Sequence, residues 1–391
     1  MSYQLIDAYQ MSRNAFEELR IQLRTLSWLG VLRFSIDFEK CLVRENASEE
    51  QSAWLYMMGV VCISCCLIIF SYYFPQHFFL GNHNNTGNCY ALINIRSCSL
   101  VTMLVYIQLY VQRYRFANLL KCMLKFNQIS ESRTEAGRFG FPYKLHLSLF
   151  VFCMLNFAHG YWEAGVRGTT IPIFLIQYGF SYLILGQVIV LFVGFQRILL
   201  STLKHHNKQL VKNFKSGKKC RGFYGIFRNY SEVVWLCHVE INRCFGLLLL
   251  PITGFILLIT PSGPFYLVST IFEGRYQQNW RFAFMTLTAV FWSVPWVVLL
   301  VLAMDINDVQ KEANKTAKIL AKVPRTGTGL DRMIEKFLLK NLRQQPILTA
   351  YGFFALDKST LFKLFTAIFT YMVILVQFKE MENTTKTINK F

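Results

Sequence analysis

Polar side chains in one apolar stretch near the C-terminus, residues 361–378, are the first candidates for chemistry. At about 100° per residue of an α-helix, all of them between positions 363 and 377 except Tyr371 share an arc of roughly 100°. Two aliphatic residues, Val373 and Ile374, lie on the same arc. Together these residues form a stripe that consists of Lys363, Thr366, Thr370, Val373, Ile374 and Gln377. Polar groups inside a bilayer avoid lipid. The stripe therefore predicts either hydrogen bonds to an adjacent helix or contact with water.

A second group of side chains has the chemistry of a small-molecule site, which is mostly apolar and aromatic with a few convergent polar groups. The ligand-contact residues that we predict are His159, Trp162, Gln177, Tyr178, Tyr182 and Trp280. Prolines at positions 251, 261 and 264 leave backbone carbonyls unpaired, which a water-filled cavity could satisfy. The alternative is that these aromatic residues face lipid, because Trp and Tyr favour membrane interfaces.

Residues typical of catalysis or metal binding form no recognisable set. The spacing of Cys237, His238 and Cys244 matches no closed zinc-ligand set, and no phosphate-binding glycine loop is present. His205 lies in a basic run without a nucleophile in a recognisable turn. We therefore expect no enzyme, metal or cofactor, with a membrane-embedded acyltransferase that uses His159 as a distant alternative.

The composition indicates the environment of these residues. Hydrophobic residues make up 53% of the 391 residues, charged residues make up 16%, and the mean hydropathy is +0.32. Soluble domains are about 45–50% apolar and about 25% charged. The net charge of +19 is typical of nucleic-acid binding only in a soluble chain, whereas membrane proteins concentrate Lys and Arg in cytoplasmic loops. We therefore predict a polytopic membrane protein that binds no nucleic acid.

Seven stretches reach the roughly 20 apolar residues that cross a bilayer. They form one domain and cover approximately residues 54–74, 89–111, 145–162, 171–200, 244–272, 282–304 and 361–378. The fourth is longer than a bilayer requires, so its end is predicted to continue into the cytoplasm. Residues 26–38 form a shorter stretch that contains Arg33 and Asp37, and we exclude it.

The Lys and Arg residues orient the chain. Segments 1–53, 112–144, 201–243 and 305–359 carry 32 of the 41, and the alternate segments carry 6. The positive-inside rule then places the N-terminus in the cytoplasm and the C-terminus outside. A G-protein-coupled receptor has the opposite orientation and remains only as an alternative. Of the glycosylation sequons, only Asn84 and Asn383 face outward in this topology.

The cytoplasmic connection 305–359 contains apolar residues at helical spacing, namely Val309, Ala313, Ala317 and Leu320. This spacing predicts a helix below the membrane. Such extensions indicate a cytoplasmic helical subdomain. A basic helix that faces anionic membrane lipid is the alternative.

Two segments carry a resemblance to a known family. Thr349-Ala-Tyr-Gly-Phe-Phe-Ala-Leu-Asp-Lys, followed by Thr370-Tyr371-Met-Val-Ile-Leu-Val-Gln377-Phe378, resembles the C-terminal signature of insect gustatory receptors. The resemblance implies a ligand-gated cation channel in the plasma membrane of sensory neuron dendrites. It also implies a homo- or hetero-tetramer of related subunits, whose seventh helices line one pore above a cytoplasmic bundle.

The resemblance gives the stripe a role as pore lining. Four copies of Gln377 would form a polar ring near the outer end, and Val373 with Ile374 a hydrophobic gate. Sugar-sensing members commonly carry an acidic residue where Met372 stands. The small-molecule tastant is therefore expected to be bitter or otherwise aversive, with pheromone-like ligands next.

Overall fold

The computed structural model describes twelve parts of the chain. These parts are residues 19–30, 35–37, 42–44, 47–75, 85–129, 141–163, 170–215, 240–272, 293–304, 307–322, 331–339 without 333 and 337, and 348–388.

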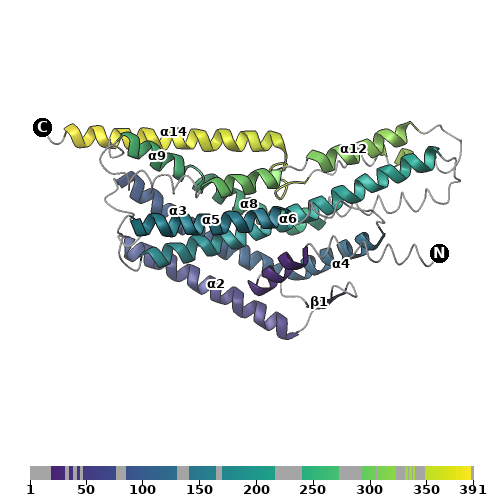
Figure 1. Ribbon diagram of the computed structural model, residues 1–391, viewed down its shortest axis with the longest axis horizontal. Helices are drawn as coiled ribbons and strands as arrows, with labels where there is room; N and C mark the ends of the chain where they lie inside the picture. The colour runs from purple at the N-terminus through teal and green to yellow at the C-terminus, as the bar shows by residue number, and fades with distance from the viewer. Residues whose placement is uncertain are drawn as a thin grey trace.

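Long helices run side by side along the long axis of the molecule (Figure 1). The elements that coincide with the expected spans are α2 (Ala47–Tyr73), α3 (Asn85–Val111), α5 (Phe141–Glu163), α6 (Thr170–Lys215), α8 (Asn242–Ile259), α9 (Ser262–Phe272), the helix Ser293–Met304 and α14 (Lys358–Ile388). Within the described residues, 5 helices are long and apolar enough to cross a membrane. A helix satisfies its own backbone groups, which hydrocarbon requires.

Three helices extend the bundle at the end opposite the C-terminus (Figure 1). The 46 residues of α6 give a length of about 69 Å, far beyond a bilayer of about 30 Å. α4 (Arg113–Ile129) follows α3, and α12 (Asn307–Ala321) forms where the spacing in 305–359 predicts a helix. This end carries the Lys-rich segments that the charge asymmetry assigns to the cytoplasm.

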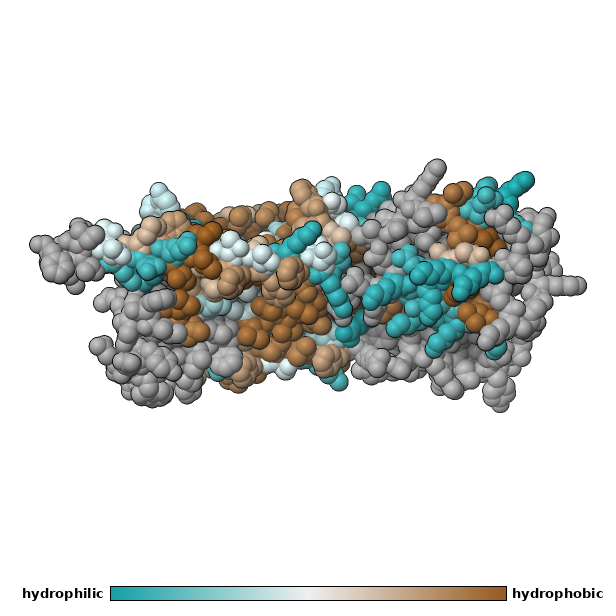
Figure 2. Space-filling view, turned by 90° about the horizontal axis from the view of Figure 1, so that it is seen from above, coloured by the Kyte–Doolittle hydropathy of each residue, from teal (hydrophilic) through white to brown (hydrophobic). Residues whose placement is uncertain are grey.

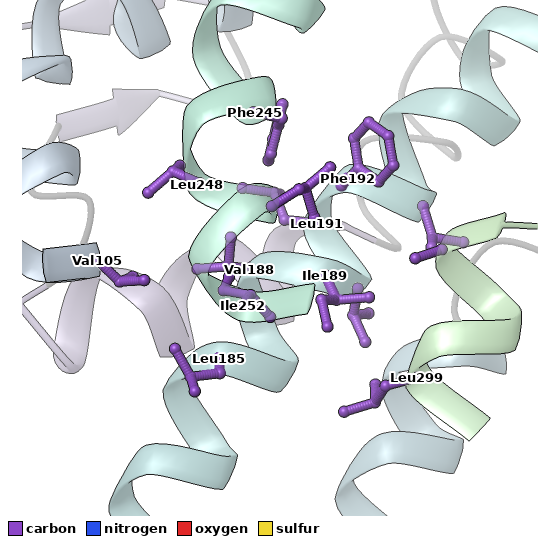
Figure 3. Close-up of a cluster of buried hydrophobic side chains, with 14 of the residues drawn as sticks. Val105, Leu185, Val188, Ile189, Leu191, Phe192, Phe245, Leu248, Ile252 and Leu299 are labelled. Atoms are coloured by element: carbon purple, nitrogen blue, oxygen red, sulfur yellow. The ribbon is translucent and has the colours of Figure 1, made fainter. Parts of the chain in front are cut away.

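The core surrounds α6, which is apolar on all sides over much of its length. In the apolar window of α6, 83% of the residues are buried. Figure 3 shows Val188, Leu191 and Phe192 of α6 beside Phe245 and Leu248 of α8. A helix that is hydrophobic all round belongs in the centre of a bundle, and α6 occupies that place.

The N-terminal segment packs against this core, which the sequence did not indicate. Residues 19–28 are helical, and Leu19, Leu23 and Leu26 are buried. The Gln22 side chain donates a hydrogen bond to the Gln187 carbonyl of α6 at 3.3 Å. A short antiparallel sheet follows, in which β1 (Ser35–Asp37) pairs with β2 (Leu42–Arg44).

The stretch 244–272, expected as one helix, is divided into α8 and α9 at Thr260 and Pro261. Pro261 has no N–H to continue the ladder of hydrogen bonds, and a proline ring clashes with the preceding turn. Up to this point the helical hydrogen bonds continue, since both the backbone N–H and the hydroxyl of Thr260 donate to the Ile256 carbonyl, at 3.0 Å and 2.6 Å. The seventh helix is also longer than expected, because α14 has 31 residues.

α5 approaches α6 closely across a glycine. A Cβ atom on Gly186 would lie 2.1 Å from Cε1 of His146, whose ring is buried. One turn away, the rings of Phe150 and Tyr182 stack with centroids 5.9 Å apart. Small residues permit such contacts between membrane helices.

We predict that Gly186→Ala destabilises the protein by about 1–3 kcal/mol, because the added methyl must displace the His146 ring. Thermal unfolding of the purified protein measures this effect. Gly59→Ala is the matched control, since a Cβ at position 59 meets nothing within 4 Å. Equal melting temperatures for the two variants would contradict the close packing of α5 on α6.

Candidate functional site

A tight turn of residues 348–357 precedes the helix that carries the polar stripe. Leu356 donates its backbone N–H to the Leu348 carbonyl at 2.9 Å. Tyr351 and Gly352 at the tip have φ angles of 52° and 82°. Glycine adopts this left-handed conformation without a steric penalty, and Tyr351 is held in it by the surrounding hydrogen bonds. We call residues 348–357 the docking turn.

The docking turn is attached to the start of α8. The Thr349 backbone N–H donates to Oδ1 of Asn242 at 3.0 Å. Gly246 provides the room, since a Cβ there would lie 2.6 Å from the Tyr351 nitrogen. At the other end of the turn, Asp357 Oδ1 accepts the Thr360 N–H at 2.7 Å and caps α14. The first residues of α14 are therefore fixed relative to α8.

One face of α14 packs against its own protomer. The Tyr371 ring lies 6.1 Å from the Tyr90 ring of α3, and Leu375 is buried with Tyr90 and Phe265. Further along, the Thr86 hydroxyl donates to the Glu382 carboxylate at 2.8 Å. These contacts are four and seven residues apart along α14, so they lie on one side of the helix.

The predicted stripe lies on the opposite side. Between positions 361 and 385, every exposed residue falls within one arc of about 180°, with the stripe near its middle. Only 6% of the residues in the apolar window of α14 are buried. All six residues of the stripe are exposed, namely Lys363, Thr366, Thr370, Val373, Ile374 and Gln377. Figure 2 shows largely hydrophobic surface over the half of the molecule that contains α14.

The polar atoms of the stripe are only partly satisfied within the helix. The Thr366 hydroxyl donates to the Phe362 carbonyl at 3.0 Å, and the Thr370 hydroxyl donates to the Thr366 carbonyl at 2.9 Å. Each hydroxyl oxygen keeps lone pairs that can accept from water or face a cation. Beyond Gln377, the exposed Glu380 continues the outer face, whereas Lys379 is buried on the protomer side.

Three predicted ligand contacts lie together on α6. Gln177, Tyr178 and Tyr182 are buried, and the Gln177 amide donates to the Ser99 hydroxyl of α3 at 2.8 Å. The Tyr182 ring lies 4.9 Å from the ring of Trp296, which precedes α12. The structure thus places polar and aromatic side chains at the junction of three helices.

Around Tyr182, aromatic rings form a group that we call the aromatic cluster, which consists of His146, Phe150, Tyr182, Phe255 and Trp296. Of these five residues, only Tyr182 was expected from the sequence. Trp296 connects α6 to α8, because its ring also lies 5.3 Å from that of Phe255. His146 and Trp296 each interrupt an apolar stretch with a polar atom, a signal that could have identified them.

The remaining predicted residues are described only in part. His159 and Trp162 belong to α5, but their side chains lie outside the described set, as do Trp280 and Asn84 altogether. Asn383 lies on α14 and is half-buried. Among the described residues, no three His, Cys, Asp or Glu side chains gather as a metal site would require.

Comparison with known proteins identifies the family. The sequence model described as 7tm Chemosensory receptor matches residues 19–382. The chain belongs to the 7tm chemosensory receptor family. Gustatory and pheromone receptor 39a, isoform D, of Drosophila melanogaster is 74% identical over 97% of this chain and 100% of its own length. Gustatory and pheromone receptor 32a of the same organism is 25% identical over 94% of this chain and 86% of its own length.

A solved structure shares the fold. The insect olfactory receptor OR5 from Machilis hrabei superposes with a TM-score of 0.70 at 12% identity, covering 94% of this chain and 99% of that one. The same receptor in complex with eugenol gives a TM-score of 0.68. This likeness and the family match confirm the all-α, seven-helix membrane fold. The family match and the 74% identical relative confirm the insect gustatory receptor family. The alternatives of a G-protein-coupled receptor and of an acyltransferase are thereby set aside.

In this 7tm chemosensory receptor, we predict that Asp357→Ala destabilises the start of α14 by about 1 kcal/mol through loss of its cap. Thermal unfolding of the purified receptor measures the effect. Asp357→Asn keeps an accepting oxygen and is expected to retain most of the stability. A larger loss for Asn than for Ala would show that capping is not the role of Asp357.

Proposed function

We propose that this chain is a subunit of a ligand-gated cation channel that detects aversive tastants at the plasma membrane of sensory neuron dendrites. The observation that carries the proposal is the exposure of the polar stripe of α14 on the side opposite its protomer contacts. Hydroxyl and amide groups at bilayer depth require water or a polar neighbour. A water-filled path for ions would hydrate these groups and would explain why they share one face of α14.

A single helix cannot enclose an ion path, so the function requires several copies. We infer a tetramer, formed from this chain alone or with related subunits, in which four α14 helices surround one axis. The packed face of α14 directs the stripe outward from each protomer. Flanking exposed residues such as Phe369 would then contact the neighbouring copy.

Each part of the stripe has a role in this arrangement. Val373 and Ile374, which are 37% and 41% exposed in the protomer, form the hydrophobic constriction that closes by dewetting. Gln377 forms a neutral polar ring on the outer side of this gate. The exposed Glu380 lies beyond the ring, where carboxylates attract cations.

Ligand binding is assigned to the aromatic cluster and the adjacent Gln177 and Tyr178. His159, Trp162 and Trp280 remain proposed contacts. Ring contacts lead from Tyr182 through Trp296 to Phe255 of α8. α8 also holds the docking turn through Asn242. A ligand that favours one position of α8 would therefore bias the position of α14.

Two ligand classes are supported by different observations. Met372, in place of an acidic residue, favours bitter or aversive tastants over sugars. A pheromone is the second candidate, because the 74% identical relative is named a gustatory and pheromone receptor. Glycans on Asn84 and Asn383 are proposed for the outer surface.

We predict that Gln377→Ala changes single-channel conductance or cation selectivity by at least about twofold, since it removes the polar ring. The receptor is expressed in a heterologous cell without added G proteins. Whole-cell recording against a panel of bitter compounds and sugars identifies an agonist before the variant is compared.

Gln51→Ala is the matched control for this measurement. It makes the same change at an exposed residue of α2, away from the stripe of α14. Ion permeation of this variant is expected to equal that of the unmodified receptor. Unchanged permeation in Gln377→Ala, at equal surface expression, would show that Gln377 does not line the pore.

We also predict that Tyr182→Phe raises the half-maximal agonist concentration by about threefold to thirtyfold, with unchanged conductance, because one ligand hydrogen bond is lost. Tyr106→Phe removes a similarly buried hydroxyl, one that donates to the Leu29 carbonyl at 2.8 Å. That control is expected to keep the agonist sensitivity. Equal sensitivity of both variants would place the ligand elsewhere.

A further inference from the structure

A basic groove is lined by residues of α6 and α12. The ends of these two helices lie opposite the C-terminus of the chain (Figure 1). The volume of the groove is about 680 Å³, within the range of about 300–1,000 Å³ of small-molecule sites. Its lining includes Lys204, Lys208, Lys212, Lys315, Val211 and Ile319. In Figure 2, hydrophilic side chains gather over this end of the molecule beside smaller hydrophobic patches.

A buried hydrogen-bond network forms the floor of the groove. The Asn207 amide donates to the Glu312 backbone carbonyl at 2.9 Å and to its carboxylate at 3.0 Å. The buried Thr316 hydroxyl donates to the side-chain oxygen Oδ1 of Asn207. Lys315 pairs with the same Glu312 carboxylate at 3.3 Å. The groove is therefore a fixed junction of two helices, and the carboxylate in its lining is already bound.

Three of the lysines form a row of like charge along α6. Lys204, Lys208 and Lys212 follow one another at four-residue spacing, and all three are exposed. Like charges at this spacing repel each other on a helix. In the part of the chain that the structure describes, none of their ammonium groups has an ion-pair partner. An anion in the groove would relieve this repulsion.

We propose that the groove binds a small, multiply phosphorylated anion of the inositol polyphosphate class, either free in the cytosol or as the headgroup of a membrane lipid. Lysine ammonium groups are compact point charges that suit phosphate oxygens. The row extends about 12 Å along α6, so a flat bilayer surface meets Lys204 well before Lys212. A compact polyanion seated in the groove reaches the row and Lys315 together.

Such an anion would join two helices that lead to different spans. α6 continues into the fourth span, and α12 follows the helix Ser293–Met304, which carries Trp296 of the aromatic cluster. Because only the folded junction presents all four lysines, the bound anion stabilises the folded receptor. This inference concerns binding and stability, so it stands apart from the proposed ion conduction.

The test uses the purified full-length receptor in detergent, titrated with inositol hexakisphosphate at about 0.15 M salt, where exposed charges are largely screened beyond about 8 Å. Saturable binding and a raised melting temperature are expected. The double variant Lys208→Gln, Lys212→Gln is expected to weaken binding at least about tenfold. A second arm uses nanodiscs that contain phosphatidylinositol bisphosphate, compared with nanodiscs of equal charge made with phosphatidylserine.

The double variant Lys318→Gln, Lys322→Gln is the control, because it removes the same charge from exposed lysines outside the groove lining. Binding to the soluble probe identifies a free anion, and selective binding to the phosphoinositide alone identifies a lipid headgroup. The proposal is overturned if neither the soluble probe nor the phosphoinositide binds, or if the two double variants weaken binding equally. Thermal unfolding of both double variants without the probe shows whether they are folded. Removal of like charges should not lower their melting temperatures.

Discussion

Hydrocarbon leaves a polar side chain only two acceptable surroundings, another polar group or water, and this constraint governs the outer face of α14. Thr366 and Thr370 satisfy their donors on their own helix, but a glutamine amide carries two donors and an acceptor. Within the described part of the protomer, no hydrogen bond to Gln377 is found. This is the reason for our proposal that the outer face of α14 meets water and further copies of the receptor.

The protomer divides into a rigid centre and a peripheral helix. α6 is buried over most of its apolar length, whereas α14 is held at its start by the docking turn and further along by Tyr90, Phe265 and Thr86. All of these contacts use one face. A helix attached in this way keeps its orientation about its own axis and can still shift with α8, on which the docking turn rests.

Sequence patterns were sufficient for features that depend on local periodicity. The apolar stretches, the continuation of α6, the helix in 305–359 and the position of the stripe follow from composition and spacing. Periodicity alone could not decide whether the stripe faces a neighbour within the protomer. That answer required the packing of Leu375 and Tyr371 on the other side.

Features that depend on distant contacts were not predictable from the sequence. Residues 26–38 are too short and too charged to indicate a span, yet Leu26 is fully buried because the helix of residues 19–28, to which it belongs, packs on α6. The partner of Thr349 is Asn242, which lies 107 positions away. The prolines at positions 251 and 261 were both evident, but the sequence did not decide which of them divides the helix: α8 continues through Pro251 and ends before Pro261.

The most direct test of the central claim is a density map of the assembled, purified receptor in a lipid environment. The account predicts four copies around one axis, with Thr370 and Gln377 of every copy facing a continuous aqueous density. A map in which these side chains face lipid, or lie within a single protomer away from any shared axis, would contradict it.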